Sequence, residues 1–538
     1  MSNIIRGTML LTGANYLSKL LGIIYLIPFE ALVGYNAIAL YTFAYTPYSI
    51  LISISTMGIP LAMSKFVSKH NTMGDYRAGR VMLKSAMKVM VLTGFIAFLI
   101  LFFGAESIAK LSIADYDLNN SVEDAAFVIK MVSFALLILP TMSILRGFFQ
   151  GYGSMGPTAI SVVMEQIVRI VFLLGSVFII IKIMDGSTLS AVGIATFAAF
   201  VGAVGSLLVL AFYWKSRKAY LDVELQKQTV KKRHTKKQMY RELLSYAGPF
   251  VLVGIATPLY QLIDQFTIIR AMGNIGLKDI SELVYAVIVS LGHKLVIIPV
   301  TIATGLSLAL LPVITKSFTE NKREVYIHQI NLSLQTVMLI IIPAAVGLSI
   351  LGTEAYASFY GVDEDLAIAG PLLSWYAPVA LFFGLFTVSA SILQGLNRQN
   401  FALISLGIGI LIKVICNIPF IYLFEGKGAI FATGLAVLTA SILNIWQIQK
   451  TTNMSLKPLY KRTLLVLIFT VIMTIVVFIV KGILNGLIFD EPSRLQSIVV
   501  VIVSAGIGGY LYLWLSYKST LMEHVLGNKA RVLSKFFP

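Results

Sequence analysis

Charged residues are scarce in this sequence. Only 12% of its 538 residues are Asp, Glu, Lys or Arg, whereas 57% are hydrophobic and the mean hydropathy is +0.86. A soluble protein carries about 25% charged residues, so this chain lacks the polar side chains needed to cover all its faces in water. The composition therefore excludes a soluble multidomain enzyme, a disordered chain and a fibrous protein.

Cysteine and histidine are also rare. The single cysteine, Cys416, excludes a disulfide framework and a cysteine-based metal site, and the five histidines are too scattered to show metal-ligand spacing. The phosphate-binding string G-x-x-x-x-G-K-[ST] does not occur. We therefore expect no metal and no cofactor. Uphill transport would draw on a coupling monovalent cation, the membrane potential or a partner.

Long apolar runs are what the sequence has in abundance. They recur at the length of about 20 residues that an α-helix needs to cross the hydrocarbon core, whereas a membrane barrel would show alternating segments of about 10 residues. We predict an all-α polytopic membrane protein with fourteen transmembrane helices. The predicted spans are residues 4–28, 36–64, 81–103, 125–149, 157–181, 189–214, 243–268, 283–311, 328–350, 366–393, 400–423, 429–449, 462–485 and 496–517.

Loop charges account for the formal net charge of +17. Lys and Arg gather in alternate loops, and acidic residues gather in loops between them. The basic loops are near 65–84, 215–242, 316–323 and 450–462, and the acidic loops are near 106–124 and 354–365. Because Lys and Arg mark the cytoplasmic side, both termini are predicted to be cytoplasmic. The same rule explains the basic charge without a nucleic acid partner.

A weak internal repeat relates the two sides of the basic segment 215–242. Residues 145–169 and 389–413, at an offset of 244, share four identities and keep a basic residue at Arg169 and Lys413. A second similarity, between residues 58–69 and 305–316, has an offset of 247. Two matches with nearly the same offset indicate a repeat of six helices.

Repeats of six helices give both halves the same orientation, related by an axis along the membrane normal. The two final spans fall outside these parallel repeats. We predict an N-terminal six-helix lobe at 1–214, a basic cytoplasmic linker at 215–242, a second six-helix lobe at 243–449, and helices 13 and 14 with a cytoplasmic tail at 450–538. This organisation is typical of a transporter that exposes a central cavity to each side in turn.

Two lysines are predicted to lie at the depth of the bilayer centre. Lys19 lies in the middle of the first span, and Lys294, beside His293, lies in the eighth. Ionisable groups at this depth are costly and usually face a polar interior or a cavity. We predict that both lysines line the central cleft, with a lysine paired for structure as the alternative. Cations in a cavity favour an anionic substrate, because they attract phosphate and carboxylate.

Four further ionisable groups lie within spans. Glu165 and Arg169, four residues apart, are predicted to form an ion pair on one helix face. Lys413, the repeat equivalent of Arg169, has Gly409 where an acid would stand, so structural and functional roles stay open. Asp264 has the chemistry to bind a coupling cation, although we prefer a wetted interfacial carboxylate. The candidate substrate-binding residues are Lys19, Glu165, Arg169, His293, Lys294 and Lys413, and the candidate ion-coupling residue is Asp264.

The span arrangement and three short strings resemble a known family. The strings are Arg146–Gly151, Pro157–Ala159 and Glu165–Arg169. Together they resemble the MurJ-like lipid II flippases, and more closely the Gram-positive YtgP/SpoVB branch of the multidrug/oligosaccharidyl-lipid/polysaccharide (MOP) exporter superfamily. The resemblance covers the whole chain.

This resemblance implies a flippase of the bacterial cytoplasmic membrane, not an enzyme. The substrate would be the undecaprenyl-pyrophosphate-linked peptidoglycan precursor lipid II, and the partners would be membrane lipids and the cell-wall synthesis machinery. It also implies that Lys19 and Lys294 face the cavity, and that spans 13 and 14 form a groove for the polyprenyl tail. Tyr25 departs from the family pattern, since a second arginine is usual there. Fewer arginines weaken bidentate binding of a pyrophosphate, because lysine is a point charge.

Three other functions stay open. One is a flippase for another polyprenyl-linked glycan, such as a teichoic acid, capsule or exopolysaccharide precursor. A multidrug antiporter is less consistent with the sequence, because Lys19 and Lys294 would repel organic cations. A membrane-embedded glycosyltransferase or polymerase should carry paired carboxylates in a large outer loop, whereas the predicted outer loops here are short.

Overall fold

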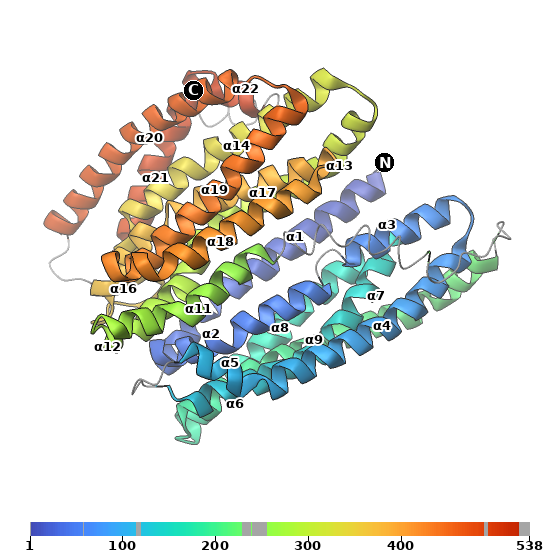
Figure 1. Ribbon diagram of the computed structural model, residues 1–538, viewed down its shortest axis with the longest axis horizontal. Coiled ribbons are helices and arrows are strands. Elements are labelled where there is room, and N and C mark those ends of the chain that lie inside the picture. Colours follow the sequence, from blue (N-terminus) through green and yellow to red (C-terminus); the bar gives the residue numbers. More distant parts are fainter. Residues whose placement is uncertain are drawn as a thin grey trace. The chain divides into compact units, whose positions relative to one another are not determined.

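The computed structural model describes residues 2–56, 59–113, 120–226, 228, 238, 255–488 and 493–526 (Figure 1). These described residues form helices and contain no strand. The all-α class predicted from the apolar runs is therefore confirmed. Among the described residues, twelve stretches are long and apolar enough to cross a membrane.

The number of spans differs from the fourteen predicted. The first two predicted spans, 4–28 and 36–64, both overlap one apolar run, Gly13–Ile54. Gly34, inside this run, has φ 76° and ψ 172°, which interrupts the helix and which a glycine adopts without strain. The predicted span 243–268 begins outside the described residues, and helix α11 (Ala256–Asn274), which covers its second part, is not among the twelve stretches. The count of fourteen stays a prediction.

The chain divides into two compact units, Met1–Ile269 and Arg270–Pro538. The division falls inside α11, so it does not test the boundaries of the four segments predicted from the sequence. Helix α9 (Thr188–Gln226) runs on into the predicted basic linker, whereas residues 227, 229–237 and 239–242 of that linker lie outside the described part of the chain. The role predicted for the linker therefore stays untested.

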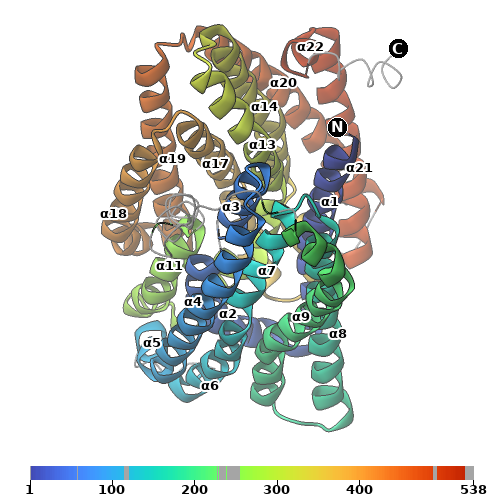
Figure 2. The same ribbon diagram turned by 90° about the vertical axis from the view of Figure 1, so that its right-hand side faces the viewer.

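The first unit is a bundle of helices (Figure 2), some of which pack closely at glycines. Its elements are α1 (Ser2–Ile24), α2 (Leu26–Thr56), α3 (Ile59–Thr72), α4 (Tyr76–Phe103), α5 (Ala105–Ser112), α6 (Val122–Ser133), η1 (Phe134–Leu137), α7 (Leu139–Gly151), α8 (Gly156–Phe178), η2 (Ile179–Ile183), α9 and the first part of α11. Helix α9 packs on α8 at Gly202, where a Cβ atom would lie 2.7 Å from the carbonyl oxygen of Glu165. Such close approach at small residues is common between membrane helices.

Helix α11 is held to the first unit by a buried amide. The Gln265 Nε2 donates to the carbonyl oxygen of Phe43 at 3.1 Å and to the hydroxyl of Ser112 at 2.7 Å. These two bonds link α11 to α2 and α5. Because Gln265 is completely buried, its amide needs such partners to offset the loss of water.

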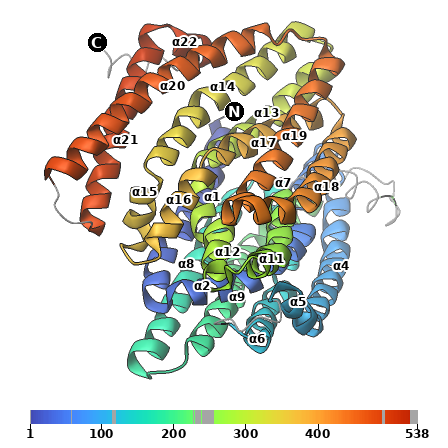
Figure 3. The same ribbon diagram turned by 60° about the vertical axis from the view of Figure 1, so that its left-hand side comes forward.

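The second unit carries a helical hairpin beside its other helices (Figure 3). Its elements are α12 (Lys278–Ala286), η3 (Val287–Leu291), α13 (Gly292–Thr319), α14 (Arg323–Ile350), α15 (Gly352–Tyr360), α16 (Leu366–Tyr376), α17 (Val379–Gly395), α18 (Gln399–Phe424), α19 (Gly426–Thr452), α20 (Lys457–Ile483), η4 (Leu484–Ile488), α21 (Arg494–Lys518) and α22 (Leu521–Leu526). The hairpin of α20 and α21 packs against α14 and α15. It coincides with the two added spans predicted after the repeat.

Candidate functional site

Glu165 pairs with Arg146 rather than with Arg169. The Arg146 Nη2 donates to Glu165 Oε2 at 2.7 Å and to the hydroxyl of Ser206 at 2.8 Å, and its Nε donates to Ser161 at 2.9 Å. The predicted Glu165–Arg169 ion pair is therefore wrong. Glu165 and Arg169 share a helix face because they are four residues apart, but α7 places Arg146 beside that face, and Arg146 binds the Glu165 carboxylate instead. The resulting network ties α7, α8 and α9 together.

Arg169 lies among tyrosines instead. Its Nη2 donates to the hydroxyl of Tyr41 at 2.9 Å. The guanidinium carbon lies 4.8 Å from the ring centroid of Tyr45 and 5.9 Å from that of Tyr25. Cation–π contacts of this kind stabilise a partly desolvated cation. We call Arg169, Tyr25, Tyr41 and Tyr45 the arginine–tyrosine cluster.

Lys19, the first predicted cavity lysine, lies on an exposed face of α1. Its neighbours Leu17 and Leu20 are also about half exposed. A lysine among exposed leucines within a membrane-crossing run is costly unless it faces a polar space. Lys19 therefore remains a candidate for contact with an anionic substrate.

Lys294 and His293 differ in their surroundings in the second unit. The His293 ring is buried, with its Nδ1 2.7 Å from the hydroxyl of Tyr376 and its edge against the ring of Phe383. Lys294 is only partly buried. His293 is thus held within the packing of α13, α16 and α17, and Lys294 is the better placed of the two to reach a substrate.

Lys413 is completely buried. Its Nζ donates to the carbonyl oxygen of Ala429 at 2.9 Å and to the hydroxyl of Thr433 at 2.6 Å. Both acceptors are on α19, so Lys413 joins α18 to α19. Of the two roles left open by the sequence, this geometry favours the structural one.

Asp264 is also buried, with 3% of its surface exposed. This burial differs from the wetted carboxylate that we preferred from the sequence, because α11 packs into the first unit through its neighbour Gln265. Among the described residues, no group of three or more His, Cys, Asp or Glu side chains is placed to hold a metal ion.

The second unit contains an apolar cavity of about 530 Å³. It lies between α14 and the α20–α21 hairpin, with α15 and α22 contributing side chains. Aliphatic and aromatic groups line it, among them Leu339, Met473, Val477 and Tyr512. The Tyr512 hydroxyl donates to the carbonyl oxygen of Leu339 at 2.7 Å, which leaves the ring facing the cavity. A space of this size and lining suits a hydrocarbon chain.

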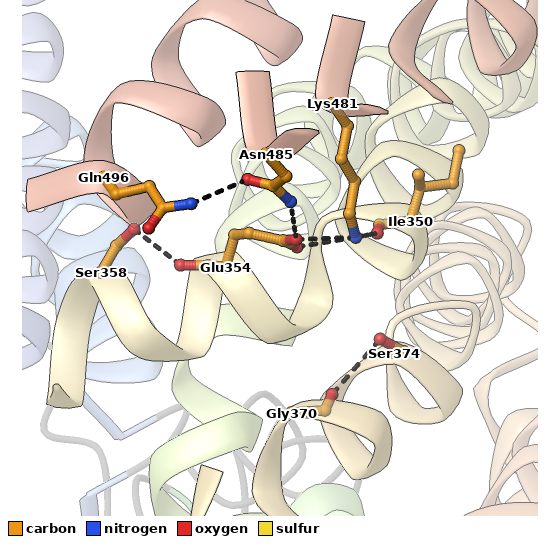
Figure 4. Close-up of polar contacts among 8 residues, drawn as sticks. All are labelled: Ile350, Glu354, Ser358, Gly370, Ser374, Lys481, Asn485 and Gln496. Atoms are coloured by element: carbon orange, nitrogen blue, oxygen red, sulfur yellow. Dashed lines mark hydrogen bonds and ion pairs between the residues drawn. The ribbon is translucent and has the colours of Figure 1, made fainter. Parts of the chain in front are cut away.

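A polar clamp joins the hairpin to α15 (Figure 4). It is within one helical turn of the cavity-lining residues Ala355 and Val477. Lys481 Nζ lies 2.8 Å from both carboxylate oxygens of Glu354 and donates to the carbonyl oxygen of Ile350 at 2.9 Å. Asn485 Nδ2 donates to Glu354 at 3.3 Å, and Gln496 Nε2 donates to Asn485 at 3.2 Å. We call Glu354, Lys481, Asn485 and Gln496 the hairpin clamp.

Gln496 also caps the first turn of helix α21. Its side-chain oxygen accepts from the backbone nitrogen of Ser493 at 3.2 Å, while the Ser493 hydroxyl accepts from the Gln496 nitrogen. This reciprocal capping box satisfies two backbone donors that the first turn leaves unpaired. The same side chain therefore starts the helix and fastens it to the clamp.

Sequence reasoning missed three of these features. The partner of Glu165 is on another helix. The tyrosines around Arg169 could not be distinguished in the sequence from the other aromatic residues. The clamp joins Glu354 to a lysine 127 positions later. The sequence did offer one signal. A carboxylate within a membrane helix needs a cation as its partner, because neither charge is stable alone in the bilayer, but the sequence does not say which cation that is.

Fold and site together define a multi-pass α-helical membrane protein with an apolar cavity and cations within its membrane helices. A family model described as polysaccharide biosynthesis protein matches residues 4–318, and one described as MatE matches residues 249–423. The lipid II flippase MurJ of Bacillus subtilis (strain 168) is 44% identical over 531 residues, which are 98% of this chain and 97% of that protein. This chain therefore belongs to the MurJ lipid II flippase family of the MOP superfamily, as the resemblance predicted.

Solved structures share the fold. A lipid II flippase MurJ in an inward closed conformation matches with a TM-score of 0.67 at 16% identity, over 96% of this chain and 99% of that one. An inward-facing multidrug resistance MATE family transporter of the MOP superfamily matches with a TM-score of 0.63 at 14% identity, over 80% of this chain and 94% of that one. At such identities the likeness concerns the fold alone.

Proposed function

We propose that this protein is a flippase that moves lipid II from the inner to the outer leaflet of the bacterial cytoplasmic membrane. Its full-length relationship to a lipid II flippase carries the proposal. The protein is a transporter and not an enzyme. Its substrate is an undecaprenyl-pyrophosphate-linked glycan, whose headgroup crosses by alternating access while the lipid tail stays in the bilayer.

The headgroup contacts are assigned to cations within the membrane helices. Lys19 and Lys294 are the primary candidates, because neither is completely buried and both carry a charge that favours a pyrophosphate. Glu165 and Lys413 act in helix packing, since each is engaged by a neighbouring helix of its own unit. His293 supports the helix that carries Lys294.

The polyprenyl tail is assigned to the apolar cavity beside α20 and α21. Its lining is hydrocarbon throughout most of its length, so an isoprenoid chain loses no hydrogen bonds by entering it. This assignment follows the family resemblance in giving the added helix pair a role in tail binding.

Two sources of energy suit the proposal. The first is the membrane potential. An anionic headgroup that moves from the cytoplasmic to the outer side is driven by this potential, which contributes about 2.3 kcal/mol per charge per 100 mV. Asp264 is the candidate for binding a coupling monovalent cation, because it is a buried carboxylate on the helix that joins the two units.

Depletion of the protein tests the proposed substrate. In depleted cells, lipid II should accumulate on the inner leaflet, and wild-type protein should restore its appearance on the outer face. Lys19→Ala and Lys294→Ala should fail to restore it. As a matched control, Lys110→Gln changes an exposed lysine paired with Glu106 and should restore it fully. Normal flipping in both alanine variants would refute the assignment of these lysines.

A second candidate function is a flippase for another polyprenyl-linked glycan. The match to the polysaccharide biosynthesis family model over residues 4–318 favours it. The same depletion distinguishes the two functions. Accumulation of a teichoic acid, capsule or exopolysaccharide precursor, with lipid II at its normal level, would replace lipid II as the substrate.

A further inference from the structure

Arg169 is a cation that the surrounding protein neutralises incompletely. Among the described residues it has no carboxylate within ion-pair distance, because Glu165 is engaged by Arg146. Its guanidinium contacts one tyrosine hydroxyl and the faces of two tyrosine rings. A guanidinium in a membrane-crossing helix usually has an acidic partner or an anionic ligand.

Two hydrogen-bond donors in the arginine–tyrosine cluster have no partner. The Nε of Arg169 and the hydroxyl of Tyr45 are both buried, and neither forms a hydrogen bond within the described part of the chain. Buried polar groups without partners are rare and costly, so each calls for an explanation. Since Arg169 Nε can only donate and the Tyr45 hydroxyl is free to donate, an anion that accepts from both would satisfy them together.

The cluster lies beside the helix that carries Lys19. A Cβ atom at Gly22 would lie 3.4 Å from the Gln166 amide nitrogen, and Arg169 lies over the ring of Tyr25. The first contact is on α1, and the second is at Tyr25, directly after the last residue of α1, Ile24, so α8 runs alongside this end of α1. Lys19 precedes Tyr25 by six residues, which is about 9 Å of helix. Two long cationic side chains from neighbouring helices thus lie within reach of one diphosphate.

We propose that Arg169 is a second anion-binding residue of the first unit, which receives the diphosphate of a polyprenyl-linked substrate together with Lys19. The planar guanidinium binds two oxygens of a phosphate through its Nε and Nη edge, whereas Lys19 supplies a point charge. The tyrosines hold the guanidinium until the anion replaces them. The inference rests on the proposed function only in taking the substrate to be a polyprenyl diphosphate.

Lipid binding to the full-length protein in nanodiscs tests this inference. Undecaprenyl diphosphate and uncharged undecaprenol are titrated into the wild type and variants, because the two lipids share a tail and differ in the anion. Arg169→Met should weaken binding of the diphosphate by roughly 10- to 150-fold, the range for a lost hydrogen bond to a charged group. Undecaprenol should bind equally to variant and wild type.

Two milder variants keep the cluster packed. Arg169→Lys retains the charge but not the fork, and should weaken diphosphate binding by less than Arg169→Met does. Tyr45→Phe retains the ring but removes the unpaired hydroxyl, and should weaken it by roughly 2- to 10-fold. Lys110→Gln, which alters an exposed ion pair on α5, serves as the control and should bind both lipids normally.

Three results would overturn the inference. They are normal binding of the diphosphate by Arg169→Met, an equal loss of both lipids in that variant, and a wild type that does not prefer the diphosphate to undecaprenol. An equal loss would show that Arg169 only supports the packing of α1, α2 and α8. Failure of the proposed function would give a different result. A wild type that binds the diphosphate through Arg169 but does not flip lipid II would refute the proposed function and leave this binding site unaffected.

Discussion

The cations within the membrane helices differ in what stabilises them. Arg146 has a carboxylate and two hydroxyls, Lys413 has a carbonyl oxygen and a hydroxyl, and Arg169 has one hydroxyl and aromatic rings. Charges satisfied by their own unit hold helices together, whereas a charge left with unpaired donors is available to a ligand. At the scale of the residue, the partners of a cation therefore distinguish packing from binding.

Removal of one partner of the Arg146–Glu165 pair should destabilise the first unit. The side chains are 14% and 26% exposed, so Arg146→Met and Glu165→Gln should each lower the free energy of unfolding by about 1–3 kcal/mol, through the charge left without its partner. The double variant should lose less than the sum of the single losses. Thermal unfolding of purified protein measures this coupling. Strictly additive losses would show that the two side chains do not interact.

Lys413→Met should separate stability from transport. The substitution removes two hydrogen bonds between α18 and α19, so the melting temperature should fall. Flipping per folded molecule should persist, because this lysine is completely buried. Flipping is measured at a temperature where the variant is still folded. Loss of flipping there would return Lys413 to the substrate site.

The hairpin of α20 and α21 forms one wall of the apolar cavity of the second unit. Its apolar side chains form a cavity with α14, and its polar side chains fasten it to α15 near that cavity. A hydrophobic cavity tends to collapse when its walls are free to move, so a fixed hairpin preserves the space. The clamp thus links the position of the hairpin to the width of the cavity.

Reversing the charges of the clamp tests this link. Glu354→Lys and Lys481→Glu should each lower the melting temperature, because each places like charges together in a partly buried site. The double reversal should recover part of the loss. The matched control, reversal of the exposed pair Glu106 and Lys110, should have little effect, as exposed pairs contribute little. Failure of the double reversal to recover any stability would show that the ion pair is not what fastens the hairpin.

At the scale of the whole molecule, the membrane class and the helical content were predictable from the sequence. Apolar runs of sufficient length have few other structures open to them, since a helix satisfies every backbone group within the bilayer. The final helix pair, α20 and α21, was predictable for the same reason. The boundary between the two units was not, because α11 is a continuous helix on both sides of Ile269.

The ion pairs and hydrogen bonds between different helices could not be predicted from the sequence. Arg146 and Glu165 are on different helices, and a local rule assigned Glu165 to the arginine four residues away. Tertiary packing decided otherwise, because α7 carries Arg146 to that carboxylate while Arg169 lies among the tyrosines of α2. Lys19 was identified as a candidate because a charge in an apolar run is visible without any knowledge of packing.

Reconstitution of the purified protein is the most direct test of whether it flips lipid II. Purified protein is incorporated into vesicles with fluorescent lipid II in both leaflets, and a membrane-impermeant quencher reports the fraction that reaches the outer leaflet. Wild-type protein should make nearly all of the lipid accessible, whereas Lys19→Ala should leave the inner half protected, as protein-free vesicles do. Protection of the inner half in vesicles that contain folded wild-type protein, with a membrane potential applied, would contradict the account.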